Sequence, residues 1–353
     1  MKALVLCGGE GTRLRPFTFS QPKHLLPVAG KPVVAHVMRA VREAGIEDVG
    51  VVVSPSQEKQ FRACLDGAAL GVRLTYVSQP EPKGLAHAVL CARGFLGQED
   101  FLVVLGDNLL ERGVQPVVEA FRRAHCATVA LAWVEDPRRF GVAVLEGEHI
   151  VRVVEKPAEP PSPWAVVGVY AFKPSLLEAA QEVRPSWRGE LELTDAIQRL
   201  VDRGERVCGF RVQGWWQDVG SAQDLLQANR RLLARLEGDV QGHVDAESQV
   251  AGPVWIGPGV KVVRSRILGP AWIDGPAWVE DGEIGPHTAL GPKVRVHRAR
   301  IQDSIVMDEA HLENVRLAGS VVGRKALVRD VQHPCSLFLG DMAQVTGLSK
   351  EGR

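Results

Sequence analysis

The chain has 353 residues, of which 45% are apolar and 24% are charged, so its composition is that of an ordinary globular protein. At roughly 150 residues per domain it is long enough for about two domains, and it needs no disulfides to bury a core. Its 42 basic and 42 acidic residues give a formal net charge of zero. This balance argues against charge-driven binding of nucleic acid or of acidic membranes.

The cysteines and the first residues point to the same kind of compartment. The six cysteines are scattered, without a C-x-x-C pair or a histidine at metal-binding spacing. We therefore expect neither a disulfide framework nor a zinc site. The glycines that begin at Gly8 follow too few apolar residues for a signal peptide, and no later run approaches a membrane-spanning length. We expect a reduced, cytoplasmic protein.

Short apolar runs alternate with helix-period segments over the first two-thirds of the chain. This alternation is typical of an α/β fold with a mostly parallel sheet and helices on both faces. The domain is expected to cover residues 1–236. The expected strands are 3–6, 49–53, 74–77, 101–105 and 150–154, and the expected helices are 33–43, 85–93 and 221–236.

The last third has a different repeat. Gly-Pro occurs six times from Gly252 to Pro292, and a branched apolar residue recurs at steps of five or six residues from Val250 to Val328. A near-hexapeptide repeat is typical of a β-helix, in which each flat face supplies one inward side chain. Coils of about 18 residues would give about four coils over this span. A Gly/Pro-rich β-sandwich is the alternative. We expect residues 237–353 to form a structural β-helix domain whose flat faces suit the contacts of a homo-oligomer.

The first expected strand is followed by a glycine-rich loop, residues 8–13. Glycines let the backbone approach an anion closely, and successive N–H groups can hold phosphates. Arg13 adds a planar positive charge. The loop is neither G-x-G-x-x-G, because position 14 is leucine, nor a Walker A loop, because no Gly-Lys-Ser/Thr follows.

With the segment P-K-H-L-L-P-V-A-G-K-P at 22–32, this loop resembles the signature of the sugar-1-phosphate nucleotidyltransferases. The resemblance implies a Rossmann-like nucleotidyltransferase domain in which the glycine-rich loop holds a nucleoside triphosphate. By the same resemblance Arg13 stabilises the leaving pyrophosphate and Lys23 contacts phosphate. The implied nucleotide-binding residues of the loop are Gly8, Gly9, Gly11 and Thr12.

Further segments match the same family in order. Residues 79–86 resemble its base-recognition segment, and a glutamine amide can read a pyrimidine edge because it has both a donor and an acceptor. Two aspartates follow apolar runs, and carboxylates are ligands suited to Mg²⁺. In the second of these segments Val219 replaces the family's usual threonine. The implied residues are Gln79 and Gly84 for the nucleotide, Asp107 and Asp218 for Mg²⁺, and Gly141, Glu155 and Lys156 for the sugar phosphate.

The Trp-Trp pair at 215–216, the D-L-L-x-A-N segment and the repeat-bearing tail together resemble the long form of the glucose-1-phosphate thymidylyltransferases, which carries a left-handed β-helix. The resemblance implies transfer from dTTP to glucose 1-phosphate. Three alternatives remain open. The enzyme could use UTP or another sugar phosphate. It could be bifunctional, with acetyl transfer at His287, His297 or His311 of the β-helix, or it could be a regulatory subunit without catalysis.

Overall fold

The computed structural model describes residues 1–347, which group by contact into two units. The first unit contains Met1–Gly9 and Val34–Asp218, and the second contains Glu10–Val33 and the chain from Val219 onward. This grouping differs from the expected division at residues 236 and 237, because the 10–33 segment shares its contacts with the later strands. The two-domain division therefore stays a prediction.

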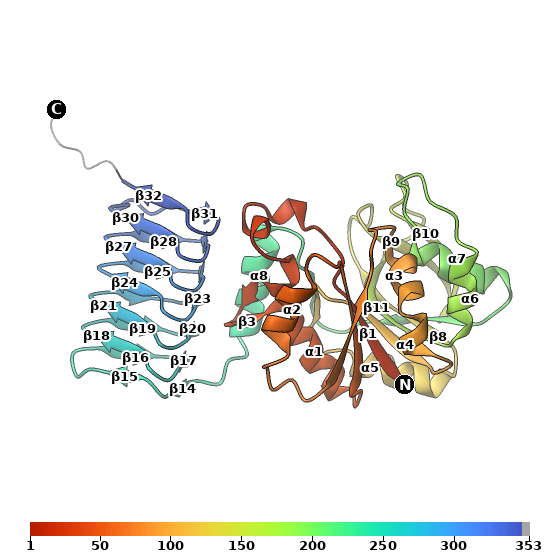
Figure 1. The fold of residues 1–353 in the computed structure, drawn as a ribbon, viewed down its shortest axis with the longest axis horizontal. Coiled ribbons are helices and arrows are strands. Elements are labelled where there is room, and N and C mark those ends of the chain that lie inside the picture. Colours follow the sequence, from red (N-terminus) through yellow and green to blue (C-terminus); the bar gives the residue numbers. More distant parts are fainter. Residues whose placement is uncertain (348–353) are drawn as a thin grey trace. The chain divides into compact units, whose positions relative to one another are not determined.

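A nine-stranded sheet forms the centre of the first unit, in the order β5-β4-β1-β6-β11-β8-β12-β10-β9 (Figure 1). Each strand that the sequence predicts is present as β1, β4, β5, β6 or β10. The strands are β1 (Lys2–Leu6), β4 (Asp48–Val53), β5 (Arg73–Ser78), β6 (Phe101–Leu105), β8 (Ala127–Trp133), β9 (Gly141–Glu146), β10 (His149–Glu155), β11 (Trp164–Phe172) and β12 (Val207–Arg211). A second, two-stranded sheet pairs β7 (Asn108–Leu110) with β13 (Trp216–Asp218).

The parallel character of the large sheet is confined to part of it. Strands β5, β4, β1 and β6 are parallel neighbours, as are β8 and β12. Strand β11 runs antiparallel to both β6 and β8, and β9 and β10 form an antiparallel pair. The α/β class is confirmed, and the sheet is mixed rather than mostly parallel beyond β6.

Helices cover the sheet because its central strands are apolar on both faces. Residues of α3, α6 and α7 share one buried cluster with β1, β6 and β8, whereas α5 packs on β8, β11 and β12 outside that cluster. The predicted helix at 85–93 is divided at Ala92 into α3 and α4. The helices are α1 (Val33–Glu43), α2 (Glu58–Leu65), α3 (Leu85–Cys91), α4 (Arg93–Leu96), α5 (Gln115–Ala124), α6 (Ser175–Gln181) and α7 (Leu193–Asp202).

One expectation about the cysteines is wrong. Cys126 and Cys208 form a disulfide, with Cα atoms 6.5 Å apart. Their separation of 82 residues carries no signal in the sequence. They meet because β12 pairs with β8 in a register that sets Val207 beside Ala127. The other four cysteines, Cys7, Cys64, Cys91 and Cys335, form no disulfide within the described part of the chain.

The second unit begins with a segment of little regular structure and continues through a helix into a β-helix. The 10–33 segment holds three 3₁₀ turns, at Thr12–Leu14, Phe17–Phe19 and Lys23–Leu25, and the short hairpin of β2 (Pro27–Val28) and β3 (Lys31–Pro32). Helix α8 (Ala222–Leu233) lies within the predicted 221–236 helix. The side-chain oxygen of Ser221 accepts a bond from the Asp224 N–H and so caps α8.

The tail is a left-handed parallel β-helix built from three stacked sheets. Two sheets have seven strands and the third has five, so the coils extend beyond the repeat-bearing span at both ends. Ala271 pairs with Thr288, seventeen residues later, and Ala289 pairs with Ile305, sixteen later. The coils are therefore shorter than the expected length of about 18 residues, because many steps have five residues.

The strands of the β-helix are short and are assigned to the three sheets in rotation. The first sheet contains β14 (Asp239–Val240), β17 (Val254–Ile256), β20 (Ala271–Ile273), β23 (Thr288–Leu290), β26 (Ile305–Val306), β29 (Val321–Val322) and β31 (Phe338–Leu339). The second contains β15 (His243–Val244), β18 (Lys261–Val263), β21 (Trp278–Glu280), β24 (Arg295–His297), β27 (His311–Glu313), β30 (Leu327–Arg329) and β32 (Gln344–Thr346). The third contains β16 (Gln249–Ala251), β19 (Arg266–Leu268), β22 (Glu283–Ile284), β25 (Arg300–Gln302) and β28 (Arg316–Ala318).

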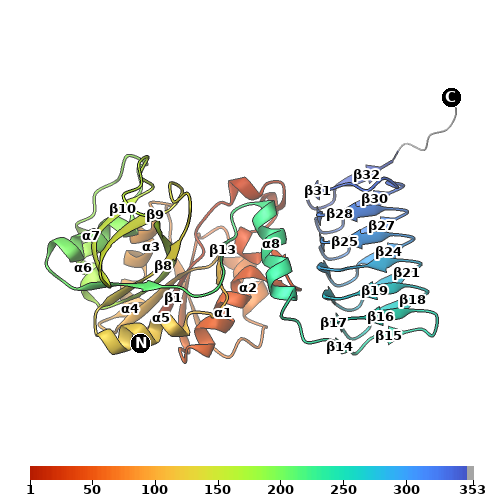
Figure 2. The same ribbon diagram turned by 180° about the vertical axis from the view of Figure 1, so that it is seen from behind.

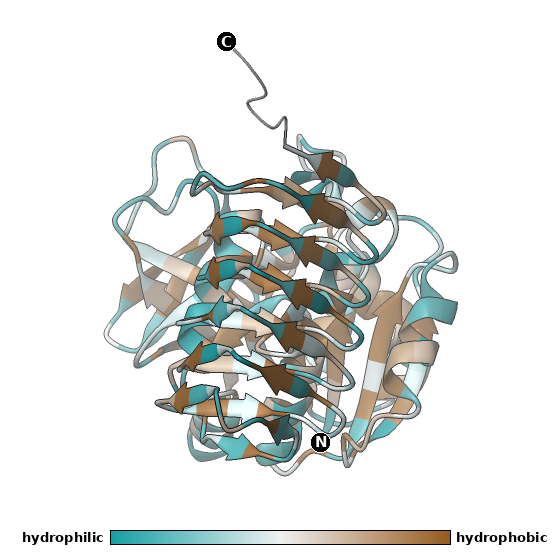
Figure 3. Ribbon diagram, turned by 90° about the vertical axis from the view of Figure 1, so that its left-hand side faces the viewer, coloured by the Kyte–Doolittle hydropathy of each residue, from teal (hydrophilic) through white to brown (hydrophobic). Residues whose placement is uncertain are grey.

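The recurring apolar residues form the core of these coils, and apolar positions recur along successive strands in Figure 3. Two of the predicted core residues depart from the pattern. Val250 is 37% exposed because it lies on the first strand of its sheet, and Leu268 is only half-buried because Ile267 points inward in its place. The β-sandwich alternative is excluded, since neighbouring strands are parallel and one coil apart.

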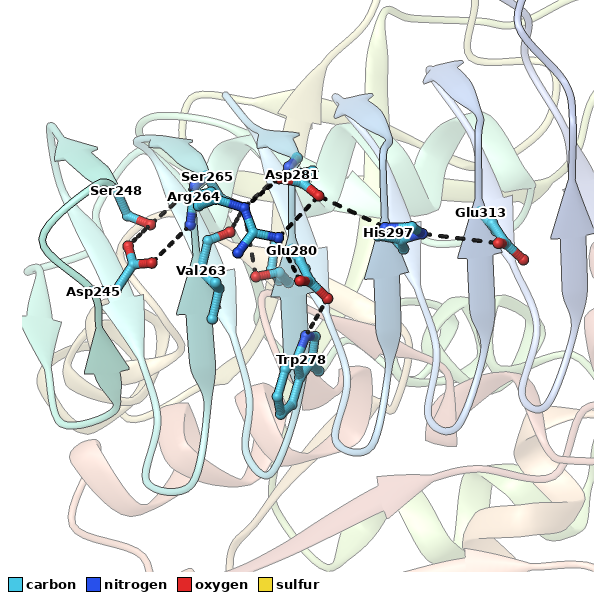
Figure 4. A network of polar contacts seen from close by, with 12 residues as sticks. Asp245, Ser248, Val263, Arg264, Ser265, Trp278, Glu280, Asp281, His297 and Glu313 are labelled. Atoms are coloured by element: carbon cyan, nitrogen blue, oxygen red, sulfur yellow. Dashed lines mark hydrogen bonds and ion pairs between the residues drawn. The ribbon is translucent and has the colours of Figure 1, made fainter.

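Polar side chains at the corners link successive coils (Figure 4). Arg264 donates to Asp281 at 2.8 Å and to Glu280 at 2.5 Å. His297 lies between Asp281 and Glu313, at 3.7 and 3.8 Å. These groups are partly exposed, so their ion pairs contribute little to stability, and the apolar interior supplies most of it. No helix within residues 1–347 is long and apolar enough to cross a membrane.

Candidate active site

Of the predicted site residues, Asp218 ends strand β13 of the small sheet, and Asp107 immediately precedes its partner strand β7. Strand β6 ends at Leu105, and β7 begins at Asn108. In the antiparallel pairing of β7 with β13, Asn108 lies opposite Asp218. Asp107 is only 6% exposed and follows the carboxyl end of a parallel strand, where α/β sheets bind ligands. The structure thus places the backbones of the two aspartates side by side.

Asn108 and Trp216 hold this pair in place. The Asn108 amide donates to Asp107 Oδ1 at 3.0 Å, and its oxygen accepts from Trp216 Nε1 at 2.6 Å. The Trp216 ring meets Phe140 edge to face, with centroids 5.0 Å apart. In the sequence, Trp216 is notable only as part of the Trp-Trp pair at 215–216. The Trp216 indole N–H orients the Asn108 amide, and that amide in turn orients Asp107. The local sequence does not show this, because the contact depends on the pairing of β13 with β7.

The aspartates fit a divalent cation that is completed by substrate. No cluster of three or more His, Cys, Asp or Glu side chains suited to a metal occurs within the described chain. Two hard carboxylate ligands are nevertheless typical of Mg²⁺ sites, which commonly obtain their other oxygens from phosphates and water. The residues present therefore fit a divalent cation only if phosphate oxygens and water would supply its other ligands.

Gly8, Gln79 and Gly84 are close together in the first unit. Gln79 is 6% exposed, and its amide nitrogen lies 3.1 Å from the Gly84 carbonyl oxygen and 3.2 Å from His87 Nδ1. A Cβ on Gly8 would lie 2.6 Å from the Gln79 side-chain oxygen, so Gly8 makes room for this amide. Gly9, which follows, is half-buried.

The backbone around Gly84 explains why this position must be glycine, which the sequence alone does not show. Its φ is 100°, and a Cβ there would lie 2.5 Å from the Leu191 carbonyl oxygen. The backbone of Leu191 donates to Lys83 and accepts from Ala86, so two distant segments run together at this point. The family resemblance implies a role for Gly84 in nucleotide binding. The contact with Leu191 already requires glycine.

We expect Gly84→Ala to lower the thermal unfolding midpoint by several °C. The strained backbone and the overlap with Leu191 should cost about 1–3 kcal/mol or more. Gly94→Ala is the matched control, since Gly94 is helical and a Cβ there would meet nothing within 4 Å. Differential scanning calorimetry measures the unfolding midpoint of both variants. Equal midpoints for the two would contradict the requirement for glycine at position 84.

Glu155 is the centre of the predicted sugar-phosphate site. Strand β10 ends at Glu155, as Pro157 predicts, and Lys156 has a left-handed φ of 40°. This turn places Lys156 Nζ 3.4 Å from Glu155 Oε1, so both side chains reach the same region. Thr194 donates to Glu155 Oε2 at 3.1 Å. A Cβ on Gly141 would lie 2.7 Å from the Thr194 methyl group, which explains the glycine.

Charge is concentrated around Glu155. Arg188, which sequence analysis did not single out, lies 3.6 Å from Glu155 and 3.2 Å from Glu192. Burial, followed by the negative charge of Glu155, raises the pKa of Glu192. The same two causes raise the pKa of Asp195. The Glu190–Asp195 segment is thus both the entry to α7 and part of this charged cluster.

The second unit carries Gly11, Thr12, Arg13 and Lys23. Gly11 has φ 64°, its carbonyl oxygen accepts from the Thr18 hydroxyl at 2.7 Å, and a Cβ there would lie 3.0 Å from Lys23 Cβ. Gly11 is therefore packed against the stem of Lys23. Thr12 and Arg13 are exposed. A Cβ on Gly220 would lie 3.0 Å from Arg13 Nη2, so the guanidinium lies against bare backbone just beyond β13.

The histidines considered for acetyl transfer are dispersed over the β-helix. His287 is at a turn where its carbonyl oxygen accepts from Asn229, and His297 lies between two carboxylates. Burial, helped by the positive charges of Arg295 and Arg329, lowers the pKa of His311. His297 and His311 line a surface hollow of about 500 Å³, and His287 is not among its lining residues.

Comparison with known proteins identifies the family of this chain. The nucleotidyl transferase family model matches residues 2–235. A glucose-1-phosphate thymidylyltransferase of Streptomyces antibioticus is 43% identical over 98% of this chain and 99% of its own length. A UTP–glucose-1-phosphate uridylyltransferase, AglF of Haloferax volcanii, is 39% identical over 66% of this chain and 96% of its own length.

Among solved structures, a Bacillus anthracis protein assigned as a glucose-1-phosphate thymidylyltransferase, in complex with sucrose, matches with a TM-score of 0.61. It is 36% identical and covers 67% of this chain and 95% of its own. The family model spans more than half of the chain, and the full-length relative exceeds 40% identity. This chain therefore belongs to the nucleotidyl transferase family.

Proposed function

We propose that the protein is a glucose-1-phosphate thymidylyltransferase, which joins dTTP and glucose 1-phosphate to give dTDP-glucose and pyrophosphate. The observation that supports nucleotidyl transfer is the pairing of β7 with β13, which sets Asp218 opposite Asn108, the neighbour of Asp107. The choice of dTTP and glucose rests on similarity to the Streptomyces enzyme over both whole chains. The match to the uridylyltransferase covers only the first two-thirds of this chain.

The proposed reaction needs no nucleophilic side chain, because the substrate phosphate is the nucleophile. An oxygen of glucose 1-phosphate attacks the α-phosphorus of dTTP, a new P–O bond forms, and the bond to the β-phosphate breaks with release of pyrophosphate. The protein's task is to align the reactants and balance their charge. Mg²⁺ bound to Asp107 and Asp218 would neutralise phosphate oxygens.

Each of the other candidate residues is assigned to one of the two substrates. Gly8, Gly9, Gly11 and Thr12 would offer backbone N–H groups to the triphosphate, with Arg13 and Lys23 supplying positive charge. Gln79 would read the thymine edge. Glu155, held by Thr194, would accept bonds from sugar hydroxyls, and Lys156 would bind the sugar phosphate.

Measurement of pyrophosphate release with dTTP, UTP, CTP, ATP and GTP, each against several sugar 1-phosphates, tests the proposal. The highest kcat/KM is expected for dTTP with glucose 1-phosphate. A clear preference for UTP or for another sugar phosphate would replace the substrate assignment. Transfer of acetyl groups from acetyl-CoA to an amino-sugar phosphate would establish the bifunctional alternative.

We expect Gln79→Ala and Lys156→Ala to weaken different substrates. Loss of one strong polar contact costs about 1.5–3 kcal/mol, or roughly 10- to 150-fold in KM. Gln79→Ala should raise KM for dTTP and relax the choice of pyrimidine, and Lys156→Ala should raise KM for glucose 1-phosphate. Steady-state kinetics with each substrate varied in turn measures both.

Two results would contradict this division. If both variants weaken the same substrate, the pocket is wrongly divided. If Gln79→Ala raises both KM values equally, then its bonds to Gly84 and His87 only brace the 79–84 loop. Lys83→Ala is a suitable control for the loop, because the Lys83 side chain is paired with Glu81 at 2.9 Å and is half exposed.

A further inference from the structure

The segment that carries Arg13 and Lys23 has little internal structure to fix its shape. Residues 10–33 contain three single 3₁₀ turns and one hairpin of two-residue strands. An isolated hairpin of this size is at best marginally stable. The segment is grouped with α8 and the β-helix in one unit, so its conformation depends on contacts with those elements.

Asn229 of α8 supplies the first of these contacts. Its side chain is fully buried, and its oxygen accepts from the Ala29 N–H at 2.8 Å. Its amide nitrogen donates to the His287 carbonyl oxygen at 3.0 Å. Ala29 and His287 both have left-handed backbone, with φ of 46° and 57°. One amide thus joins the hairpin turn to a corner of the β-helix. Helix α8 packs on β2 and β23, and Figure 2 shows the chain running from α8 into β14 of the β-helix.

The next residue of the hairpin turn is fitted to the same coils. Gly30 has φ 76°, and a Cβ there would overlap the Trp272 ring. Trp272 stacks on Trp255 of the neighbouring coil, with ring centroids 4.9 Å apart. Arg230, next to Asn229, makes a two-pronged ion pair with Asp303. The hairpin end of the segment is therefore bound by several independent contacts.

A second group of contacts holds the middle of the segment, at residues 16–21. Arg324 donates to Gln21 Oε1 at 2.8 Å and is paired with Asp341 at 3.3 Å. Asp341 in turn accepts from the Ser20 hydroxyl at 2.7 Å. A Cβ on Gly340 would lie 3.0 Å from the Pro16 ring. Lys23 lies between these two attachment points in the chain, and Arg13 precedes them both.

We propose that α8 and the β-helix position the phosphate-binding segment, with Asn229 of α8 as the positioning residue at its hairpin turn and Arg324 of the β-helix as the positioning residue at its middle. This goes beyond a structural or assembly role for the tail, and its kinetic part rests on the proposed function. A displacement of about 1 Å in a charged group can cost on the order of 100-fold in rate. Changes on the β-helix should therefore lower kcat without touching a substrate.

The test compares Arg324→Ala with Arg329→Ala. Both arginines lie on the same coil and pair with a carboxylate of the β-helix, but Arg324 also donates to Gln21 of the 10–33 segment. Arg324→Ala should lower kcat about 10-fold or more per intact enzyme, with KM for glucose 1-phosphate within about twofold of wild type. Arg329→Ala should match wild type. Asn229→Leu, which removes both amide bonds, should lower kcat at least as much.

Hydrogen–deuterium exchange on the full-length variants supplies a second readout. Exchange should increase in peptides from residues 10–33 for Arg324→Ala and Asn229→Leu, but not for Arg329→Ala. Unchanged exchange in this segment, or increased exchange with wild-type kcat, would overturn the proposal. If wild type transfers no nucleotide with any substrate pair, the proposed function fails. Exchange then still decides whether the β-helix holds the segment.

Discussion

Asp107→Asn and Asp218→Asn should each reduce kcat by at least about 100-fold, the scale of losing one strong electrostatic stabiliser in a transition state. Asn108 donates to Asp107 and lies opposite Asp218, so we expect the two charges to act on one ligand. Substitution by asparagine keeps the shape and removes only the charge. Pyrophosphate release should also stop when EDTA removes the divalent cation.

Asp100→Asn is the matched control for the metal prediction. Asp100 is exposed and precedes β6, whereas Asp107 follows the same strand at its carboxyl end. Its substitution should leave kcat and metal dependence unchanged. Full activity in EDTA, or wild-type turnover by the Asp107→Asn and Asp218→Asn double variant, would refute the metal assignment.

The regular elements follow from the sequence because their signals are local. The continuous apolar run at Phe101–Leu105 becomes β6, and the amphipathic spacing of residues 33–43 becomes α1, with Gly45 beyond its end in left-handed conformation. The five- and six-residue steps likewise predict the β-helix core. In each case, periodicity over a few residues decides which side chains are buried.

The pairing of distant segments was less predictable, because nothing in the local pattern encodes it. Sequence analysis did not single out Arg188, which reaches Glu155 only through the fold. The Cys126–Cys208 disulfide depends on the register of β12 against β8, and Asn229 matters only because Ala29 and His287 converge on it. The predicted homo-oligomer and cytoplasmic location remain predictions.

Arg13→Ala should lower kcat by a far larger factor than it raises KM for dTTP. Arg13 is exposed, and its guanidinium lies against the bare backbone of Gly220, so it has room to meet a phosphate with both of its N–H edges. We expect a fall in kcat of about 100- to 1,000-fold, as for loss of one preorganised donor. KM for dTTP should change only a few-fold.

The reason for this split is the movement of charge during the reaction. Negative charge accumulates on the departing pyrophosphate as the bond to the α-phosphorus breaks, so a contact there strengthens in the transition state and appears in kcat. Arg13→Lys should recover only part of the rate, because a lysine keeps the charge but not the planar fork. Arg15→Ala is the control, since Arg15 is also exposed and lies over the Phe19 ring, 5.1 Å from its centroid. An Arg13→Ala enzyme with raised KM and wild-type kcat would make Arg13 a ground-state binding residue, and the leaving-group charge would then have to be balanced elsewhere.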